Sequence, residues 1–237
     1  MRDFTEIWSY LAGDPLLWLC ATLVAYVLGD AASRTVGRAP WMNPVLVAAI
    51  LLGLLLWLTG TSYATYFEGA QFVHFLLGPA TVALAVPLWT QRHALRPALL
   101  PIIAALLAGS ATAVLSALAI GHAMGLSPQL LATLAPKSTT APVALGISEG
   151  LGGSPTLTAV LVILTGIIGA IVVTPLMNAL RIRDWRARGF ATGVAAHGIG
   201  TARALQVHPQ AGAFAGIGMA LNAMLTALLA PWALGLF

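Results

Sequence analysis

Long apolar runs separated by short polar segments dominate this chain. A membrane-crossing helix needs about 20 consecutive, mostly apolar residues. The runs that approach or exceed this length are 15–32, 44–60, 71–89, 98–123, 156–180 and 212–236. Two further apolar segments, 128–148 and 190–205, are interrupted by small and polar residues. The pattern therefore predicts about six full transmembrane helices and two segments that are broken or re-entrant.

The composition indicates a protein whose solvent is lipid. Of the 237 residues, 59% are hydrophobic and 8% are charged, whereas a soluble domain carries about 25% charged residues. We therefore expect an all-α integral membrane protein with a single transmembrane domain over residues 1–237. The basic residues lie in short loops, so the net charge of +4 indicates membrane topology and no nucleic-acid partner. Most tryptophans, Trp18 and Trp57 among them, lie near the ends of the predicted spans, as an interfacial belt does.

Lys and Arg residues set the predicted orientation. Cytoplasmic loops are enriched in them, so the loops that contain Arg34, Arg92 and Arg186 are predicted to be cytoplasmic and the N-terminus to lie outside. The residues before Pro15 lack the positive charge of a signal peptide, so the first run is interpreted as a retained span. In this orientation both ends of 128–148 face outside. That segment therefore has to enter the membrane and return.

A weak internal repeat connects two parts of the chain. The run FLLGPATVALAVPL followed by Pro97 is similar to TLAPKSTTAPVALG followed by Pro155, and at a constant offset Thr81 falls on Thr139. Repeats whose matching segments are interrupted by Gly or Pro are a feature of transporter binding sites. This similarity adds Gly78 and Thr81 to the candidate substrate-binding residues, and it would divide the domain into halves of about 1–125 and 126–237. Chance similarity between apolar stretches is the competing explanation.

The first candidate site is a polar run inside 128–148. Its residues are Lys137, Ser138, Thr139, Thr140 and Pro142. A lysine at membrane depth costs about 2.5–3.5 kcal/mol, which a functional site repays more readily than packing does. Prolines interrupt a helix, and a half-helix that starts here would direct N–H groups at an anion. We expect this run to bind a small carboxylate anion. The alternative is that Lys137 lies near the outer surface and extends its ammonium group into water.

A second candidate cluster lies within 190–205. Its members are His197, Gly198, Gly200, Thr201 and Arg203. Glycines permit close backbone approach or unwinding, a histidine changes protonation near neutral pH, and the guanidinium of Arg203 suits a carboxylate. The competing interpretation is a helix interface made of small residues, with Arg203 at the water boundary.

Several other residues bear on gating, ion coupling and assembly. Glu149 either pairs with Lys137 at the mouth of a cavity or is a solvated loop acid. Asn222 is interpreted as an interhelical hydrogen-bonding residue; together with Glu149 and His197 it is a candidate for gating or ion coupling. A face of small residues that includes Gly166, Gly169 and Ala170 permits close helix packing, so we expect a homo-oligomer.

No enzyme, metal or cofactor motif fits the chain. Residues 146–150 match G-x-S-x-G around Ser148, but that motif requires a strand and a helix in a soluble α/β sheet. Cys20 is the only cysteine, which excludes a disulfide within one chain. There is no phosphate loop and no Cys/His set with metal-ligand spacing. We therefore predict neither catalysis nor a bound metal or cofactor.

Several blocks of the sequence resemble the LrgB/CidB family from about residue 40 to the C-terminus. They include NPVLVAAILLGLLLWLTG, KSTTAP, AHGIGTARA and GAFAGIGMALNAMLTALLAP. The resemblance implies a multi-pass protein of the bacterial cytoplasmic (inner) membrane that works with a small LrgA/CidA-type membrane partner. Bacterial members of this family are described as antiholin-like proteins that affect murein hydrolase activity and cell lysis. Plastid relatives resemble glycolate/glycerate translocators, and transport of small carboxylates such as pyruvate has been linked to the bacterial pairs.

The residues favour transport over a purely regulatory role. Cations within the membrane beside broken helices suit a small hydroxy-acid anion, whereas a lysis regulator needs no such cluster. We predict a transporter of small monocarboxylates of the glycolate, glycerate, lactate and pyruvate class. The alternative is an antiholin-like regulator of murein hydrolase activity without transport activity of its own. If the chain is a transporter, KSTTAP and HGIGTAR must meet across one cavity.

Overall fold

The computed structural model describes residues 13–39, 41–76, 79, 82–83, 86, 89 and 98–237. All regular secondary structure in these residues is helical, which confirms the predicted all-α class. They fall into two compact units, Met1–Ala80 and Thr81–Phe237.

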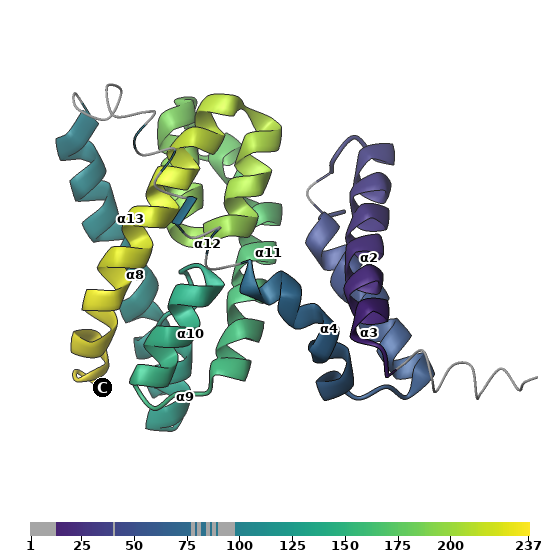
Figure 1. Cartoon of the computed structure of the whole chain (residues 1–237). Helices are drawn as coiled ribbons and strands as arrows, with labels where there is room; N and C mark the ends of the chain where they lie inside the picture. The colour runs from purple at the N-terminus through teal and green to yellow at the C-terminus, as the bar shows by residue number, and fades with distance from the viewer. Residues whose placement is uncertain are drawn as a thin grey trace, which may run out of the picture. The chain divides into compact units, whose positions relative to one another are not determined.

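The described part of the first unit consists of three helices. They are α2 (Pro15–Thr35), α3 (Pro44–Thr59) and α4 (Tyr63–Phe75) (Figure 1). Asp14 and Asn43 cap the first two, each accepting a hydrogen bond of 2.9 Å from the amide two residues further on. Packing of α2 on α3 depends on Gly29, because a Cβ atom there would stand 2.5 Å from the carbonyl oxygen of Pro44.

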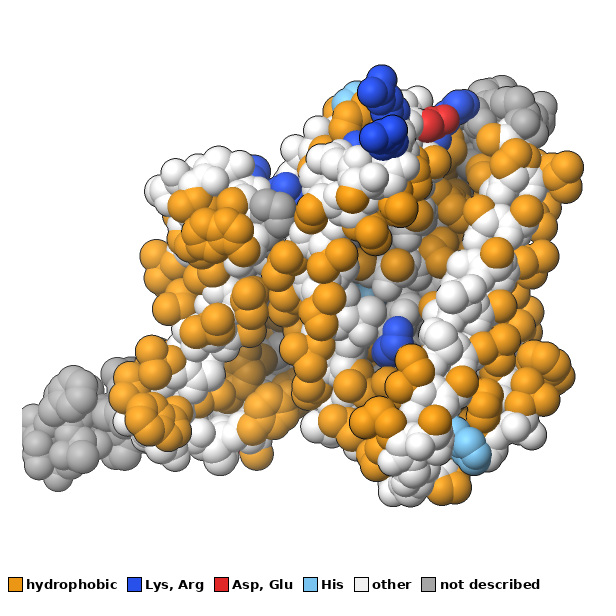
Figure 2. Space-filling view, turned by 180° about the vertical axis from the view of Figure 1, so that it is seen from behind, with side chains coloured by type: hydrophobic (Ala, Val, Ile, Leu, Met, Phe, Trp, Pro, Cys, Tyr) orange, Lys and Arg blue, Asp and Glu red, His pale blue; other side chains and the backbone are white. Residues whose placement is uncertain are grey.

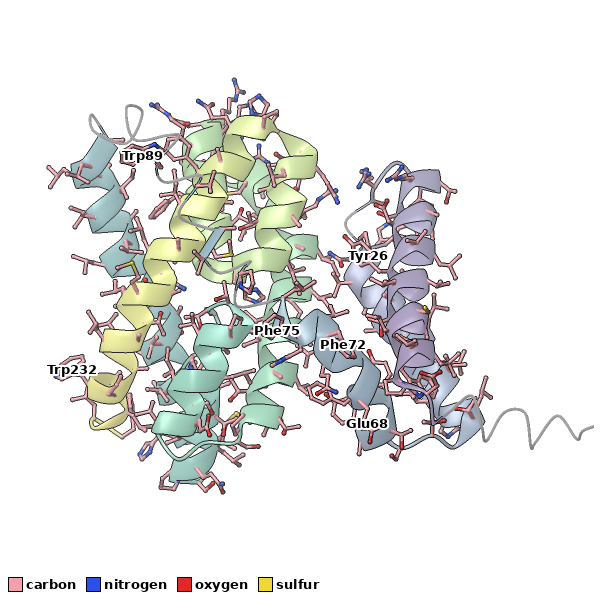
Figure 3. All side chains as sticks on the ribbon, viewed as in Figure 1. Tyr26, Glu68, Phe72, Phe75, Trp89 and Trp232 are labelled. Carbon is pink, nitrogen blue, oxygen red and sulfur yellow. The ribbon has the colours of Figure 1, made fainter. Side chains whose placement is uncertain are left out.

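The tryptophans of the first unit differ from one another. Trp18 is fully buried, and its ring meets that of Tyr66 edge to face at a centroid distance of 6.0 Å. Its assignment to an interfacial belt is therefore wrong, because the ring packs inside the unit against Tyr66 and is not exposed to lipid headgroups. Trp57 is 78% exposed, as a belt residue should be. Figure 3 shows Phe72 and Phe75 projecting from α4, where both are exposed.

The second unit contains six helices within the described residues. They are α8 (Leu99–Ala123), α9 (Pro128–Leu134), α10 (Ala141–Gly150), α11 (Pro155–Ala179), α12 (Trp185–Val207) and α13 (Pro209–Leu234). Helices α8 and α13 run parallel. Ile102 and Phe214, near their starts, share one apolar cluster, and Leu118 and Ala230 share another further along. The start of α12, with its arginines, lies near the first cluster, and we call this the basic end of the unit (Figure 2).

Residues 127–154 form a hairpin, which we call the first hairpin. Helix α9 stops at Leu134, the chain turns through residues 135–140, and α10 returns toward α9. The amide of Ser154 donates to Thr133 Oγ1 at 2.8 Å, and the hydroxyl of Thr158 is 3.0 Å from the Thr133 carbonyl oxygen. The predicted segment 128–148 is therefore broken where the sequence places its lysine and prolines.

Helix α12 also folds back on itself, and we call Trp185–Val207 the second hairpin. A straight helix of 23 residues would hold its ends about 34 Å apart. The rings of Trp185 and His208 instead stack with centroids 4.8 Å apart. The reversal occurs at Ala196 and His197, where the backbone leaves helical geometry and His197 adopts φ 40° and ψ −134°.

Glycines seat the second hairpin on its neighbours. A Cβ atom on Gly189 or Gly193 would collide with the carbonyl oxygens of Ala211 and Ala215 on α13. On α11, Gly166 lies against the ring of His197, and a Cβ there would stand 2.7 Å from Cε1. The small residues of α12 therefore bring three helices into close contact.

The same packing corrects one argument from the sequence. Gly169 meets Ala196 within the chain, and Ala170 is fully buried. Together with Gly166 they form the face that was expected to support assembly. Because α12 covers it, this face gives no support for an oligomer interface, and the homo-oligomer stays a prediction.

Four helices in the described residues are long and apolar enough to cross a membrane. They are α2, α8, α11 and α13. Helix α3 has 16 residues because Gly60, with φ 64°, ends it. Helix α4 begins at Tyr63, earlier than the predicted span 71–89, and most of the rest of that span lies outside the described residues. The first copy of the predicted repeat lies there as well, so the repeat stays a prediction.

Candidate functional site

The tips of the two hairpins meet inside the second unit. Lys137, in the first tip, lines one cavity together with Ala195 and Ala196, which lead into the second tip. The KSTTAP block and the residues just before the second candidate cluster are therefore neighbours, whereas His197 lines neither cavity that contains Lys137. The first hairpin brings a long polar side chain to this position, and the second hairpin brings mainly backbone and small residues.

Lys137 lies where two cavities meet. One, of about 720 Å³, lies between α8 and the first arm of α12; it also contacts Ser138 and Thr112 and extends to Ile182 near the basic end. The other, of about 530 Å³, lies between α11 and the same arm and contacts Thr165. Most of the remaining lining residues are Ala, Gly, Val, Ile, Leu and Met. Figure 2 shows a basic side chain set in a recess, away from the basic end.

The ammonium group of Lys137 is half-buried, and no carboxylate of the described residues forms an ion pair with it. Its Nζ donates to Ser138 Oγ at 3.2 Å. Lys137 is also the only lysine of the 237 residues. A cation in such surroundings is favoured when an anion binds beside it.

The three hydroxyl residues that follow Lys137 have different roles. Ser138 is buried, and its carbonyl accepts a hydrogen bond from Asn222. Thr139 donates to the Pro136 carbonyl at 3.0 Å and so closes the turn. Thr140 stands at the N-cap of α10, but its buried Oγ1 has no hydrogen-bond partner among the described residues. The start of α10 thus presents an unused hydroxyl in addition to its free amides.

Asn222 of α13 connects the first tip to the helices around it. Its Nδ2 donates to the Ser138 carbonyl at 3.1 Å, and its Oδ1 accepts from Ser110 of α8 at 2.6 Å and from Thr226 at 3.3 Å. All of these residues are buried, so the interpretation of Asn222 as an interhelical hydrogen-bonding residue is confirmed. Ser110 and Thr226 were missed because single small polar residues carry little signal within an apolar helix.

The second tip is held by hydrogen bonds of its own. His197 Nε2 lies 2.9 Å from the Val162 carbonyl of α11, and the His197 carbonyl accepts from the Thr201 hydroxyl at 2.8 Å. Thr201 and Gly198 lie close to the sulfur of Met219 on α13. Neither these two residues nor Gly200 lines the cavities that contain Lys137.

The remaining candidates lie apart from Lys137. Arg203 lines a separate crevice with Arg188. Glu149 is exposed near the C-terminal end of α10, whose 10 residues span about 15 Å from the tip; the structure therefore favours the solvated acid over a pair with Lys137. Pro142 occupies the first turn of α10. Gly78 and Thr81 lie outside the described residues.

The described residues contain no group of three His, Cys, Asp or Glu side chains that could hold a metal ion. Ser148 of the G-x-S-x-G match lies on α10 and is fully buried. Its Oγ is 2.7 Å from the Thr158 hydroxyl, so it helps to join the first hairpin to α11. This position in a helix differs from the strand-to-helix turn that the nucleophile motif requires.

Comparison with known proteins identifies the family. A model of the LrgB-like family matches residues 22–236, which include both hairpins. The uncharacterized protein YxaC of Bacillus subtilis (strain 168) is 37% identical over 198 residues, covering 84% of this chain and 86% of its own. The holin-like protein CidB of Staphylococcus aureus (strain Mu50 / ATCC 700699) is 33% identical over 222 residues, covering 94% and 96%.

A second Bacillus subtilis (strain 168) protein, the uncharacterized protein YwbG, is 35% identical over 219 residues, covering 91% of this chain and 96% of its own. No solved structure matches the chain. The family match covers almost the whole sequence, and the relatives are similar over nearly their full lengths. This multi-pass membrane protein therefore belongs to the LrgB-like family.

Proposed function

We propose that this protein is a carrier of small monocarboxylates and that the substrate carboxylate binds Lys137 where the hairpin tips meet. One observation carries the proposal: the only lysine of the chain lines two cavities and has no ion pair with a described residue. A charge at membrane depth is costly unless it is paired. An anionic substrate would supply the missing pair.

In the proposed topology, both hairpins are re-entrant and enter the membrane from opposite sides. The first would enter from outside and the second from the cytoplasm, with the N-terminus outside and the basic end cytoplasmic. The stacked rings of Trp185 and His208 bring the ends of the second hairpin together, and the amide of Ser154, which follows α10, donates to Thr133 of α9; both contacts support this arrangement. Because the larger cavity extends to Ile182 and Ala187, substrate would reach Lys137 from the cytoplasmic side.

Substrate selection would follow from the few polar groups at the first tip. The Lys137 ammonium would bind the carboxylate, while Ser138, Thr140 and the amides at the start of α10 would bond its oxygens or a neighbouring hydroxyl. The largely apolar walls favour a small acid with few other polar groups. Glycolate, glycerate, lactate and pyruvate fit this description. We further propose that the protein works with an LrgA/CidA-type partner in the bacterial inner membrane.

Uptake by proteoliposomes tests the proposal. Purified protein, with and without the small membrane partner, should accumulate at least one of these four labelled acids. Lys137→Met keeps a long side chain but removes the charge, so substrate affinity should fall by about tenfold to a hundredfold. Arg183→Gln is the matched control, because it removes an exposed positive charge that lines neither cavity. Uptake by Lys137→Met that equals the control would contradict the proposed site.

The single lysine permits a direct binding measurement. An amine-reactive reagent can label only Lys137 and the N-terminal amine, and peptide mapping separates the two. A bound carboxylate should slow labelling of Lys137 in proportion to occupancy, while leaving the N-terminal amine unaffected. An uncharged alcohol of similar size should give no protection. If Lys137 is labelled at the same rate with and without every acid tested, the proposal that Lys137 binds the carboxylate is wrong.

A holin-like regulator without transport activity is the second candidate, and the similarity to CidB over 94% of this chain favours it. In that case the reconstituted protein, with or without its partner, should move no carboxylate, and Lys137→Met should leave murein hydrolase activity and lysis of a complemented host unchanged. Under the carrier proposal, the same substitution lowers substrate affinity by about tenfold to a hundredfold and therefore reduces uptake. Measuring both properties on one set of variants separates the two functions.

A further inference from the structure

The second hairpin brings two arginines from opposite arms to one crevice at the basic end. Arg188 lies on the first arm and Arg203 on the returning arm, 15 positions later in the sequence. Both line a narrow crevice of about 20 Å³ together with Thr174 of α11. A straight helix would separate the two arginines by about 22 Å, so their meeting depends on the reversal at His197.

The guanidinium group of Arg188 is already oriented. Its Nη2 donates to Asn178 Oδ1 at 2.8 Å and to the Thr174 carbonyl at 3.4 Å. It also stands 4.7 Å above the ring of Trp185, which stacks on His208. These contacts use one edge and one face of the group. Preorganisation of this kind lowers the entropy cost of binding an anion.

Charge complementarity indicates an anionic ligand. Arginine stays protonated in proteins, so the crevice holds two permanent positive charges, and no carboxylate is among its described lining residues. Asp184, beside the crevice in sequence, pairs with Arg186 at 2.9 Å, and the hydrogen bonds from Arg186 hold the pKa of its carboxyl below the usual range. Planar guanidinium groups match the oxygens of carboxylate and phosphate.

An apolar ridge beside the crevice distinguishes between these two anions. Ile168, Val172, Leu176 and Leu180 recur every four residues along α11, and all are exposed. Val172 and Leu176 line the cavity that shares Val173 and Thr192 with the crevice. An acyl chain can lie along this ridge while a phosphate group reaches the arginines. Basic sites between helices at the cytoplasmic surface bind lipid headgroups in this way.

We propose that Arg188 and Arg203 bind the phosphate group of an anionic membrane lipid and thereby hold the two arms of the second hairpin together. The ligand links charges on both arms, so it stabilises the closed hairpin. The two arginines line neither cavity that contains Lys137, whereas the apolar ridge borders the smaller of those cavities. The proposal does not depend on transport activity.

Thermal unfolding in detergent micelles tests the proposal. Delipidated protein is titrated with phosphatidylglycerol, and with phosphatidylcholine of the same acyl chains as the comparison. The melting temperature should rise more with phosphatidylglycerol, and added salt should reduce the difference. Arg188→Gln and Arg203→Gln should each need about tenfold more phosphatidylglycerol for the same rise. Arg183→Gln is the matched control and should behave as wild type.

Three results would overturn the proposal. Arg188→Gln and Arg203→Gln could show the same lipid dependence as Arg183→Gln. Phosphatidylcholine could stabilise wild type as much as phosphatidylglycerol does. Inorganic phosphate or glycolate could reproduce the full rise in lipid-free micelles, which would make the crevice a small-anion site. Arg203→Lys, which keeps the charge but loses the planar fork, provides a second variant if Arg203→Gln does not fold, and it should bind phosphatidylglycerol with intermediate affinity.

Discussion

The two hairpins reach the same interior position by different local chemistry. The first turns through six residues, 135–140, which include Pro136. It leaves the Thr140 hydroxyl without a hydrogen bond and the Lys137 charge without an ion pair among the described residues. The second reverses at one pair of residues, Ala196 and His197. There the His197 ring is hydrogen-bonded to the Val162 carbonyl, and the His197 carbonyl accepts a hydrogen bond from Thr201. The first tip therefore keeps a hydroxyl and a positive charge that can bind a ligand, whereas the hydrogen-bonding groups of His197 in the second tip are already used within the protein.

The glycines of the two hairpins provide the test with the largest expected effect. Gly193→Ala in the second hairpin should lower the free energy of unfolding by about 3 kcal/mol or more, because the new Cβ would collide with the backbone of α13. Gly146→Ala in the first hairpin meets nothing within 4 Å, so it should raise stability by about 0.5–1 kcal/mol. Denaturant unfolding in micelles measures both. Equal effects of the two substitutions would contradict the described packing.

Asn222→Leu should loosen the first tip and leave the second unchanged. It preserves the approximate volume but leaves the Ser138 carbonyl and the Ser110 hydroxyl without their partner. Each buried group left unsatisfied costs about 1–3 kcal/mol. Amine labelling of Lys137 should become faster as the tip moves. Ser110→Ala should have a smaller effect, because Asn222 would still hold the Ser138 carbonyl and accept from Thr226; a larger effect than that of Asn222→Leu would contradict the network.

Two neighbouring threonines separate binding from folding at the first tip. Thr140→Val removes a hydroxyl that has no hydrogen-bond partner among the described residues, so stability should stay the same or rise, while substrate affinity falls by about tenfold. Thr139→Val removes a hydrogen bond that is already made and should cost about 1 kcal/mol of stability. Unfolding and substrate protection of Lys137 measure the two properties. If Thr140→Val binds substrate with unchanged affinity, the Thr140 hydroxyl does not contact the substrate.

The smallest predicted effect concerns the second tip. His197→Ala and His197→Gly both delete the imidazole and its hydrogen bond to Val162. At φ 40°, however, glycine is unstrained whereas alanine is not. The glycine variant should therefore be more stable than the alanine variant by about 1 kcal/mol in thermal unfolding. The opposite order would show that the backbone at His197 is not strained.

The hairpins show which parts of the architecture could be read from local sequence. Prolines and hydroxyl residues around Lys137 predicted a broken segment, because they act on the backbone within a few residues. The glycines near His197 predicted either an unwound backbone or close helix packing. The structure has both, a reversal at His197 and close contacts at the glycines. For residues 190–205 the sequence predicted a broken or re-entrant segment, but it did not locate the reversal at His197. A reversal at a single histidine depends on α11 and α13, which accept the two arms through Gly166 and Gly193.

Composition and apolar run length by themselves determined that this chain is an all-α membrane protein. A helix that crosses lipid needs about 20 mostly apolar residues, and its backbone N–H and C=O groups must hydrogen-bond within the segment. They also indicated Lys137 as a candidate binding residue, because it is a single cation within an apolar segment. Only the tertiary structure decided that Lys137 joins two cavities while Arg203 meets Arg188 in a separate crevice. Lys137 and Arg203 are both isolated cations in sequence, but Lys137 lies in the first hairpin tip, whereas the reversal at His197 carries Arg203 away from the second tip to Arg188.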